Sequence, residues 1–573
     1  MILKFRFELD FTNGVVEKIL LRVAKETGVK LGLSRDERNL FAYVKASEEI
    51  IEDFSKKLAN ELPISIFLKS LDAEVTNEFK DDLKREFPSI NLPPCPKCLR
   101  EVKDKNNFNY YNPFYHCEVC GYKSNGEMKS YKEVFENLAF KLKNKEKIYI
   151  QTMNGKYEVS TSLEDAEIIV AVDLSAVATY FMSFVGEAKA LGSIEKPFVN
   201  LKTNLNFKKE FGISNPSFLV KLPDCMVLEL LCEEIKDDIK LLGLKKTQKS
   251  DDFSFDVENK DEVLLAVVTD TRNKDILIQR GDRALLPKYE KAFEKKVVGA
   301  YKEYSAYVTD DKTILKKEKN DSKIKPAFAG YFGVLAQWNL ENKSSVGFAF
   351  YKEEDSKIML NSPKFGLVEY IDFDFKFSSF KEIFASIKAM NETGEKLVKN
   401  FFEKQKDLAL KALNTDFSTS KKGVAYLWGV IGVLLGFGDN IDEGFERLLR
   451  YANSAMTKKG PRIDYKMKDK NLDPLWAVRT VMSFKLAGVD DYLLSFGVIE
   501  SFAEFLTNIY EQLHKESLLD GAVIVGDLFE GEFLNKVYTN IKKNYPTFTP
   551  KALPISGAIE AYGSAFILSK TDN

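Results

Sequence analysis

Two Cys-x-x-C pairs constrain this chain more than any other feature of its sequence. The first pair is Cys95 and Cys98, the second is Cys117 and Cys120, and 18 residues separate the pairs. Each pair lets two thiolates converge from one tight turn, so the two pairs supply a closed tetrahedral set of ligands that suits zinc. The spacing is typical of zinc ribbons. A redox-active Cys-x-x-C is the alternative, but two pairs in one small segment favour a metal site.

Such a zinc site is structural, because a metal with four protein ligands has no open position for water or substrate. His116 adjoins Cys117 but is surplus to the four ligands. The other two cysteines, Cys225 and Cys232, lie in the apolar segment VKLPDCMVLELLCEEI, and we expect both to be buried, unreactive thiols.

Histidine is scarce, since the 573 residues contain only His116 and His514. This count excludes an HExxH metalloprotease helix and a three-histidine catalytic metal site. We expect His514, in YEQLHKES, at an exposed helix position. Basic residues number 84 and acidic residues 86, a net charge of −2, which argues against DNA binding through a large basic surface.

The N-terminal segment MILKFRFELDF has no basic region followed by an apolar one, so we expect no secretory signal. The most membrane-like run, residues 423–438, has 16 uncharged residues. A spanning helix needs about 20. We therefore interpret this run as a buried core segment, expect no membrane span, and take the cytoplasm as the compartment.

The length predicts about four domains. Residues 1–76 follow the order β-α-β-β-α-β, which is the ferredoxin-like split arrangement. The cysteine module covers 91–126, and residues 130–250 mix helix and strand patterns. The largest part, 262–573, opens with hairpin-like strands and continues with long amphipathic helices. The fold class is thus multidomain, combining α+β and α/β parts.

This order of parts resembles the HypF family of hydrogenase-maturation carbamoyltransferases. Those proteins join an acylphosphatase-like domain, zinc knuckles, a YrdC-like domain and a carbamoyltransferase domain of the actin/sugar-kinase class. CPKCL from Cys95, YYNPF from Tyr110 and CEVCG from Cys117 resemble the family's first knuckle pair, and its second pair is absent here. The resemblance implies that carbamoyl phosphate and ATP form a carbamoyl adenylate. The carbamoyl group would then pass to a HypE-like partner protein or a hydrogenase subunit.

The resemblance also implies site residues. EKPF at 195–198 is similar to the Lys-Pro element of the YrdC nucleotide pocket, where Lys196 would hold a phosphate; a surface lysine before a turn proline is the alternative. AVIVGDLF, with Gly526 and Asp527, resembles a Gly-Gly-x-Phe turn that meets nucleotide phosphate. LPISGAIEAYG, with Gly557, resembles the family's closing segment. Asp527 replaces a glycine and is either a carboxylate near the nucleotide or a helix N-cap.

Other positions depart from the family pattern. Glu17 and Asp36 stand near the positions of a phosphate-binding arginine and a catalytic asparagine, so we expect no acylphosphatase activity, because carboxylates repel phosphate. Ser556 replaces a metal-binding aspartate and the histidine motif is missing, so the metal site of the last domain is expected to be lost. No catalytic residue is assigned.

Three functions stay open. The first is a diverged ATP-dependent carbamoyltransferase, and the second is a non-catalytic, zinc-binding maturation scaffold. The third, a tRNA threonylcarbamoyl enzyme, is disfavoured by the pI of 6.1, the lack of a basic stripe and the absence of a histidine motif.

Overall fold

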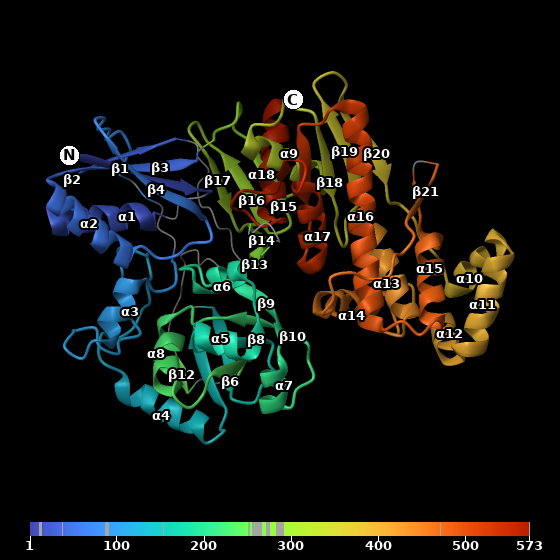
Figure 1. The fold of residues 1–573 in the computed structure, drawn as a ribbon, viewed down its shortest axis with the longest axis horizontal. Helices are drawn as coiled ribbons and strands as arrows, with labels where there is room; N and C mark the ends of the chain where they lie inside the picture. Colours follow the sequence, from blue (N-terminus) through green and yellow to red (C-terminus); the bar gives the residue numbers. More distant parts are fainter. Residues whose placement is uncertain are drawn as a thin grey trace. The chain divides into compact units, whose positions relative to one another are not determined.

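In the computed structural model of this chain, residues 1–571 are described except for 11–13, 37, 86, 88–90, 153, 250–251, 255–265, 271–274, 282–290, 322 and 470. The described residues form two units, one mainly within Met1–Asp270 and the other mainly within Lys288–Asn573. Figure 1 draws the first unit in blue to green and the second in yellow-green to red. The three N-terminal parts expected from the sequence fall within the first unit.

The first 76 residues form an antiparallel sheet with strand order β2-β3-β1-β4 and two helices (Figure 1). The elements are β1 (Ile2–Leu9), α1 (Val15–Thr27), β2 (Lys30–Arg35), β3 (Asn39–Lys45), α2 (Glu48–Glu61) and β4 (Leu68–Thr76). Helix α1 buries Val15, Ile19, Leu20 and Val23, because their spacing places them on one helical face. This is the predicted ferredoxin-like arrangement.

A small ribbon module follows, built on helix α3 (Pro96–Lys103). Cys95 is the N-cap residue of this helix, so the first cysteine pair spans its start. The Cys117 N–H donates to the Tyr122 carbonyl at 2.9 Å and closes the second pair into a turn. The fully buried Tyr122 accepts the Met226 N–H at 3.1 Å, which attaches the ribbon to the next part of the unit.

The rest of the first unit is a mixed sheet with strand order β12-β5-β6-β11-β7-β10-β9-β13. Its strands are β5 (Ile148–Thr152), β6 (Gly155–Ser160), β7 (Ile168–Ala171), β8 (Phe181–Met182, paired with β9), β9 (Phe198–Thr203), β10 (Ser217–Lys221), β11 (Leu241–Lys246), β12 (Phe253–Ser254) and β13 (Ala266–Asp270). Its helices are α4 (Lys132–Lys143), α5 (Leu174–Tyr180), α6 (Val185–Gly192), α7 (Leu205–Phe211) and α8 (Met226–Ile235). Strand β13 pairs with β9, so residues 266–270 belong to this sheet and not to the C-terminal part, where the sequence pattern had placed them.

The second unit contains a sheet with strand order β20-β19-β18-β23-β24, in which β18, β23 and β24 are parallel. Its strands are β18 (Ser345–Ala349), β19 (Lys357–Ser362), β20 (Gly366–Asp372), β23 (Gly521–Val525) and β24 (Thr547–Phe548). Further strands are β14 (Ile276–Gly281), β15 (Val298–Tyr301), β16 (Tyr304–Val308) and β17 (Thr313–Lys316).

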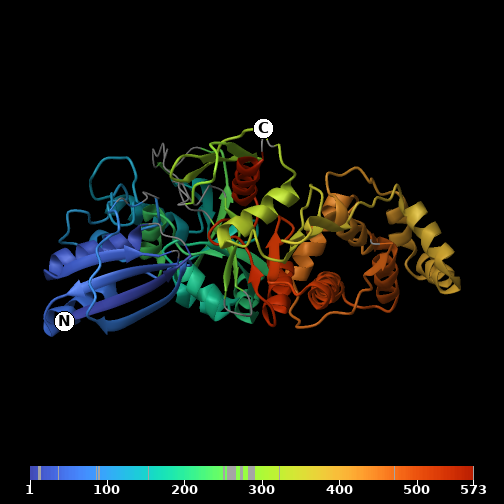
Figure 2. The same ribbon diagram turned by 90° about the horizontal axis from the view of Figure 1, so that it is seen from above.

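Helices α9 (Pro326–Trp338) and α18 (Ala558–Lys570) of this unit lie side by side (Figure 2). Glycines permit the close approach, since a Cβ on Gly563 would lie 1.8 Å from the Ala329 carbonyl oxygen. The remaining helices are α10 (Phe380–Met390), α11 (Glu392–Lys404), α12 (Lys406–Leu413), α13 (Gly423–Leu434), α14 (Ile441–Ser454), α15 (Pro474–Leu486), α16 (Asp491–Ser517) and α17 (Gly531–Lys542). A hairpin of β21 (Lys466–Lys468) and β22 (Asn471–Asp473) precedes α15.

The apolar run at 423–438 forms helix α13, and every residue of that helix is buried. It is therefore a core segment, as predicted. Within the described ranges, no helix is both long and apolar enough to cross a membrane. Helix α13 packs directly on α14, and a Cβ on Gly432 would lie 2.1 Å from the Gly444 carbonyl oxygen.

We predict that Gly432→Ala destabilises the second unit by about 1–3 kcal/mol, because the added methyl group overpacks the contact between α13 and α14. All three tryptophans, Trp338, Trp428 and Trp476, lie in this unit, so tryptophan fluorescence during urea unfolding reports its stability. The exposed Ser483→Ala is the control and should change little. Equal stabilities of the two variants would contradict the packing argument.

Candidate functional site

The four cysteines of the ribbon meet at one buried point. Their sulfur atoms all lie within 4.8 Å of one another, at 3.5 Å for Cys95 to Cys98, 4.0 Å for Cys95 to Cys117 and 3.7 Å for Cys98 to Cys120. A tetrahedron with metal–sulfur bonds of about 2.3 Å has sulfur–sulfur edges of about 3.8 Å. The donor set and its spacing therefore fit one tetrahedral zinc ion.

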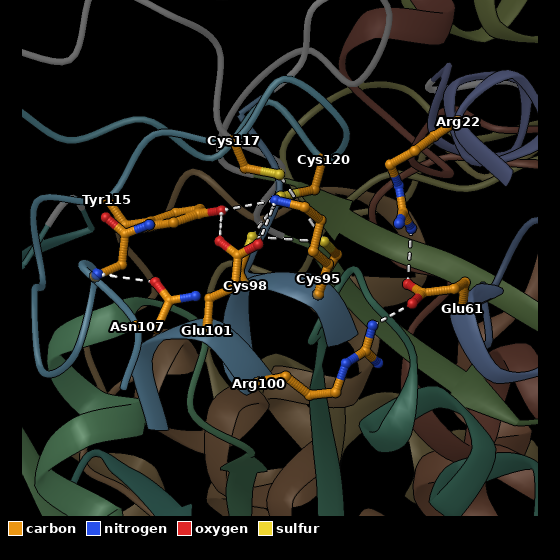
Figure 3. Close-up of polar contacts among 12 residues, drawn as sticks. Arg22, Glu61, Cys95, Cys98, Arg100, Glu101, Asn107, Tyr115, Cys117 and Cys120 are labelled. Atoms are coloured by element: carbon orange, nitrogen blue, oxygen red, sulfur yellow. Dashed lines mark hydrogen bonds and ion pairs between the residues drawn. The ribbon is translucent and has the colours of Figure 1, made fainter. Parts of the chain in front are cut away.

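A charged side chain of helix α3, Glu101, lies beside this cluster (Figure 3). Lys97, between the two cysteines of the first pair, donates to the Tyr115 hydroxyl at 3.1 Å and pairs with Glu101 at 2.7 Å. Tyr115 also donates to Glu101. These contacts hold the Lys97 ammonium group near the cysteines. Four thiolates carry more negative charge than a divalent ion neutralises, so the positive charge of Lys97 is favourable there.

Helix α3 also connects the ribbon to the parts on either side of it. Arg100 pairs with Glu61 at the end of α2, and Glu61 accepts a second bond from Arg22 of α1 at 2.7 Å (Figure 3). One turn later, Lys103 pairs with Glu233 of α8 at 2.9 Å and lies 3.9 Å from Glu229. The four-cysteine cluster thus fixes a helix that contacts both the ferredoxin-like part and the mixed sheet. His116, beside Cys117, is exposed and outside the cluster.

Lys196 begins a second cluster, at the start of β9. Its backbone is left-handed, with φ of 44°, which is uncommon for a residue other than glycine. Burial lowers the pKa of its ammonium group, against the opposing effect of the carboxylates of Glu229, Asp224 and Glu195. The lysine is therefore not a freely solvated surface residue, which was the alternative interpretation of the sequence.

The neighbours of Lys196 include buried polar groups. Lys221 pairs with Asp224 Oδ2 at 2.8 Å, and Asn154 Nδ2 donates to the same oxygen at 2.7 Å. The Oδ1 atoms of Asp224 and Asn154 are both buried and accept no hydrogen bond within the described part of the chain. Buried acceptors without a donor are rare in proteins, so these two oxygen atoms are candidates to accept a hydrogen bond from a bound molecule or water. Sequence reasoning did not find Asp224 or Asn154.

Gly526 and Asp527 follow strand β23 in the second unit. Gly526 has φ of 115°, and its Cβ would lie 2.1 Å from the Phe350 carbonyl oxygen, so the turn requires glycine. Asp527 is not a helix N-cap, because α17 begins at Gly531 with Glu530 as its N-cap. Instead, Asp527 accepts the Lys352 N–H at 2.8 Å and the Lys302 ammonium group at 3.3 Å.

The backbone N–H groups of this loop are largely occupied. Those of Gly526 and residues 528–532 each donate to an acceptor of the chain, over 2.7–3.1 Å. The first two N–H groups of α17 are among them, since Gly531 donates to Gln279 and Glu532 to Asn453. The loop therefore does not offer a row of free N–H groups to a phosphate in this conformation.

Gly557 lies close to the same loop, because Gly526 donates to the carbonyl of Ile555 at 2.9 Å. The Gly557 N–H donates to Glu560, which also accepts the Tyr351 hydroxyl at 2.7 Å. Glu560 is fully buried, and burial raises its pKa to about 7. Sequence reasoning missed this carboxyl group, although its spacing from Gly557 is that of a capping box.

The described residues show one His/Cys/Asp/Glu grouping able to hold a metal, the four-cysteine cluster. In the second unit, Ser556 supplies no carboxylate, and His514 packs its ring on those of Tyr510 and Tyr545. The prediction of an exposed His514 is therefore wrong, because the end of α16 is covered by Tyr545. The residues present do not fit the metal site that the family resemblance implies for this domain.

The positions equivalent to an acylphosphatase site are occupied by protein contacts. Glu17 is buried and accepts a hydrogen bond from Arg35 at 2.9 Å. Asp36 accepts the N–H groups of Arg38 and Asn39 at 2.9 and 2.7 Å and so closes the β2–β3 turn. The charge of Arg35 is thus already neutralised by Glu17.

Comparisons with known proteins agree on the architecture. No protein-family model matches the chain. The chain is 24% identical to Protein HydE of Wolinella succinogenes over 96% of its length and 99% of that protein. The structure resembles full-length HypF in a phosphate- and nucleotide-bound form (TM-score 0.64, 14% identity, 100% and 98% of the two chains). It also resembles HypF of T. kodakarensis (TM-score 0.68, 12% identity, 99% and 98%). These likenesses establish the multidomain fold over the whole length.

We predict that Cys98→Ser releases the metal and loosens the ribbon, because structural zinc contributes folding free energy directly. The zinc content measured by metal analysis should fall from about one ion per chain to well below half of that. Cys232→Ala, in α8 and outside the cluster, is the control and should keep the metal. Full metal content in Cys98→Ser, or none in the wild type, would contradict the assignment.

We predict that Glu560 makes the second unit less stable as the pH rises. Its raised pKa means that the folded protein keeps a proton that the unfolded chain releases, so stability falls between about pH 4.5 and pH 7 and is level above. In the wild type, this proton contributes a decrease on the order of 3 kcal/mol to the free energy of unfolding as the pH rises. The Glu560→Gln variant should lack that decrease. Urea unfolding followed by tryptophan fluorescence measures it, with exposed Glu504→Gln as control. An unchanged pH dependence in Glu560→Gln would contradict the assignment.

Proposed function

We propose that this chain is a hydrogenase-maturation factor that performs a HypF-like carbamoyl transfer. The observation that carries the proposal is the likeness of the fold to HypF over the full length of the chain, and the four-cysteine cluster supports its zinc-binding part. Carbamoyl phosphate and ATP are the proposed substrates, and a HypE-like protein or a hydrogenase subunit is the proposed acceptor. Structural zinc is the proposed metal of the ribbon.

The cluster at Lys196 is the proposed substrate site. Carbamoyl phosphate carries a phosphate at one end and an amide NH2 group at the other. The Lys196 ammonium group suits the phosphate as a point charge. The unsatisfied Oδ1 atoms of Asn154 and Asp224 suit the NH2 group, since buried acceptors gain most from a new donor. Lys221 neutralises Asp224, which limits its repulsion of the phosphate.

The test is release of AMP and pyrophosphate from ATP that depends on carbamoyl phosphate. We expect turnover by the wild type and a loss of about 10-fold or more in Lys196→Met, equal to about 1.4 kcal/mol of transition-state stabilisation. Lys208→Met, an exposed lysine on α7, is the matched control and should keep wild-type turnover. No carbamoyl-phosphate-dependent release by the wild type would contradict catalysis.

A non-catalytic maturation scaffold is the second candidate. It is favoured by the loop after β23, whose N–H groups are occupied, and by the pairing of Asp527 with Lys302. Under this alternative, Lys196→Met would fully restore hydrogenase assembly in a deletion strain. Failure of Lys196→Met to restore assembly, with restoration by Lys208→Met, would exclude the scaffold.

A further inference from the structure

A run of exposed cations follows helix α14 in the second unit. We call residues 458–468 the basic strip. Its five basic side chains are all exposed: Lys458, Lys459, Arg462, Lys466 and Lys468. A single carboxylate, Asp464, lies among them, so the local net charge is +4 in a chain whose total is −2. Most of the positive charge on this surface is therefore not balanced within the strip.

The backbone of the basic strip is anchored to the helices beneath it. Three hydrogen bonds hold the backbone: Lys536 Nζ to Lys458 O (3.3 Å), Gly460 N–H to Glu500 Oε2 (2.6 Å) and Ile463 N–H to Ser501 Oγ (2.8 Å). In addition, the Tyr465 hydroxyl donates to the Val498 carbonyl at 3.0 Å. Lys536 and Glu500 also form a buried pair with each other. The cations thus project from a fixed, mostly irregular segment, so little backbone ordering is needed on binding.

Most of these cations have no partner of their own. Lys466 lies 3.7 Å from Asp464 and 3.4 Å from the ring centroid of Trp476. The side chains of the other four form no hydrogen bond or ion pair with any described residue. Lysines on an exposed edge strand such as β21 also discourage aggregation, but Lys458, Lys459 and Arg462 lie outside any strand.

The surroundings favour a peptide over a nucleic acid. Met456 and Met467 are 59% and 40% exposed beside the cations and offer apolar contacts of the adaptable kind found at protein-binding surfaces. Single-stranded nucleic acids need aromatic faces on which bases stack. The nearby rings are covered, since Trp476 lies under Lys466 and Arg479 and Tyr465 packs against the core.

We propose that the basic strip is the docking surface for an extended acidic segment of a protein partner. Carboxylates of that segment pair with the four cations that have no partner among the described residues, and its apolar side chains contact Met456 and Met467. The basic strip belongs to the second unit, and the Lys196 cluster belongs to the first. The proposal therefore goes beyond the proposed function and does not depend on catalysis.

The test uses the full chain and a fluorescent ten-residue peptide of alternating Glu and Leu, measured by anisotropy. We expect binding that weakens with salt, and a loss of about 10-fold in the triple variant Lys459→Glu, Arg462→Glu, Lys468→Glu. The control variant Lys381→Glu, Lys388→Glu, Lys399→Glu changes the net charge equally on exposed positions of α10 and α11 and should bind within about two-fold of wild type.

Three results would overturn the proposal. The first is absence of peptide binding at low salt, and the second is an equal loss in the control variant. The third is equal or tighter binding of a ten-nucleotide oligouridylate, which would assign the strip to nucleic acid. Tryptophan fluorescence of both variants during urea unfolding checks that the second unit remains folded. A folded variant that loses binding has lost it through the changed surface charges.

Discussion

The convergence of four buried thiolates is the interaction on which the first unit depends. Two of them lie at the start of α3, so an ion bound there fixes the position and direction of that helix. Helix α3 in turn presents Arg100 to Glu61 of the ferredoxin-like part and Lys103 to Glu233 of the mixed sheet. Binding of structural zinc is worth about 10–16 kcal/mol in small zinc modules. This free energy is about an order of magnitude larger than the contribution of the surface ion pairs of α3.

The second unit is organised differently, by apolar packing and internal charge pairs. Its core is formed by α13, α16 and the parallel strands of its main sheet. Around the loop after β23, Asp527 binds Lys302 and the Lys352 N–H, and Glu560 binds Tyr351 and Gly557. The Lys302 ammonium group and the N–H groups of Lys352 and Gly557 are thereby satisfied within the chain. This is why the proposed chemistry is assigned to the Lys196 cluster, where buried acceptors still lack donors.

Much of the fold could be predicted from the sequence, because it depends on local patterns. Hydrophobic periodicity identified the β-α-β-β-α-β order of residues 1–76, and the two Cys-x-x-C pairs identified the ribbon. The clusters around Lys196 and Glu560 depend instead on contacts between residues far apart in sequence, such as Asn154 with Asp224 and Tyr351 with Glu560. No local pattern records such contacts. Of the two alternatives for Asp527, the helix N-cap was wrong, because the chain runs on to Gly531 before α17 begins.

X-ray absorption at the zinc edge of the purified full-length protein tests the central claim most directly, because it reports the ligand atoms themselves. The account predicts a single shell of four sulfur atoms at about 2.3 Å. A shell containing nitrogen or oxygen ligands, or the absence of bound zinc from metal-replete protein, would contradict the claim that the four cysteines hold one structural ion.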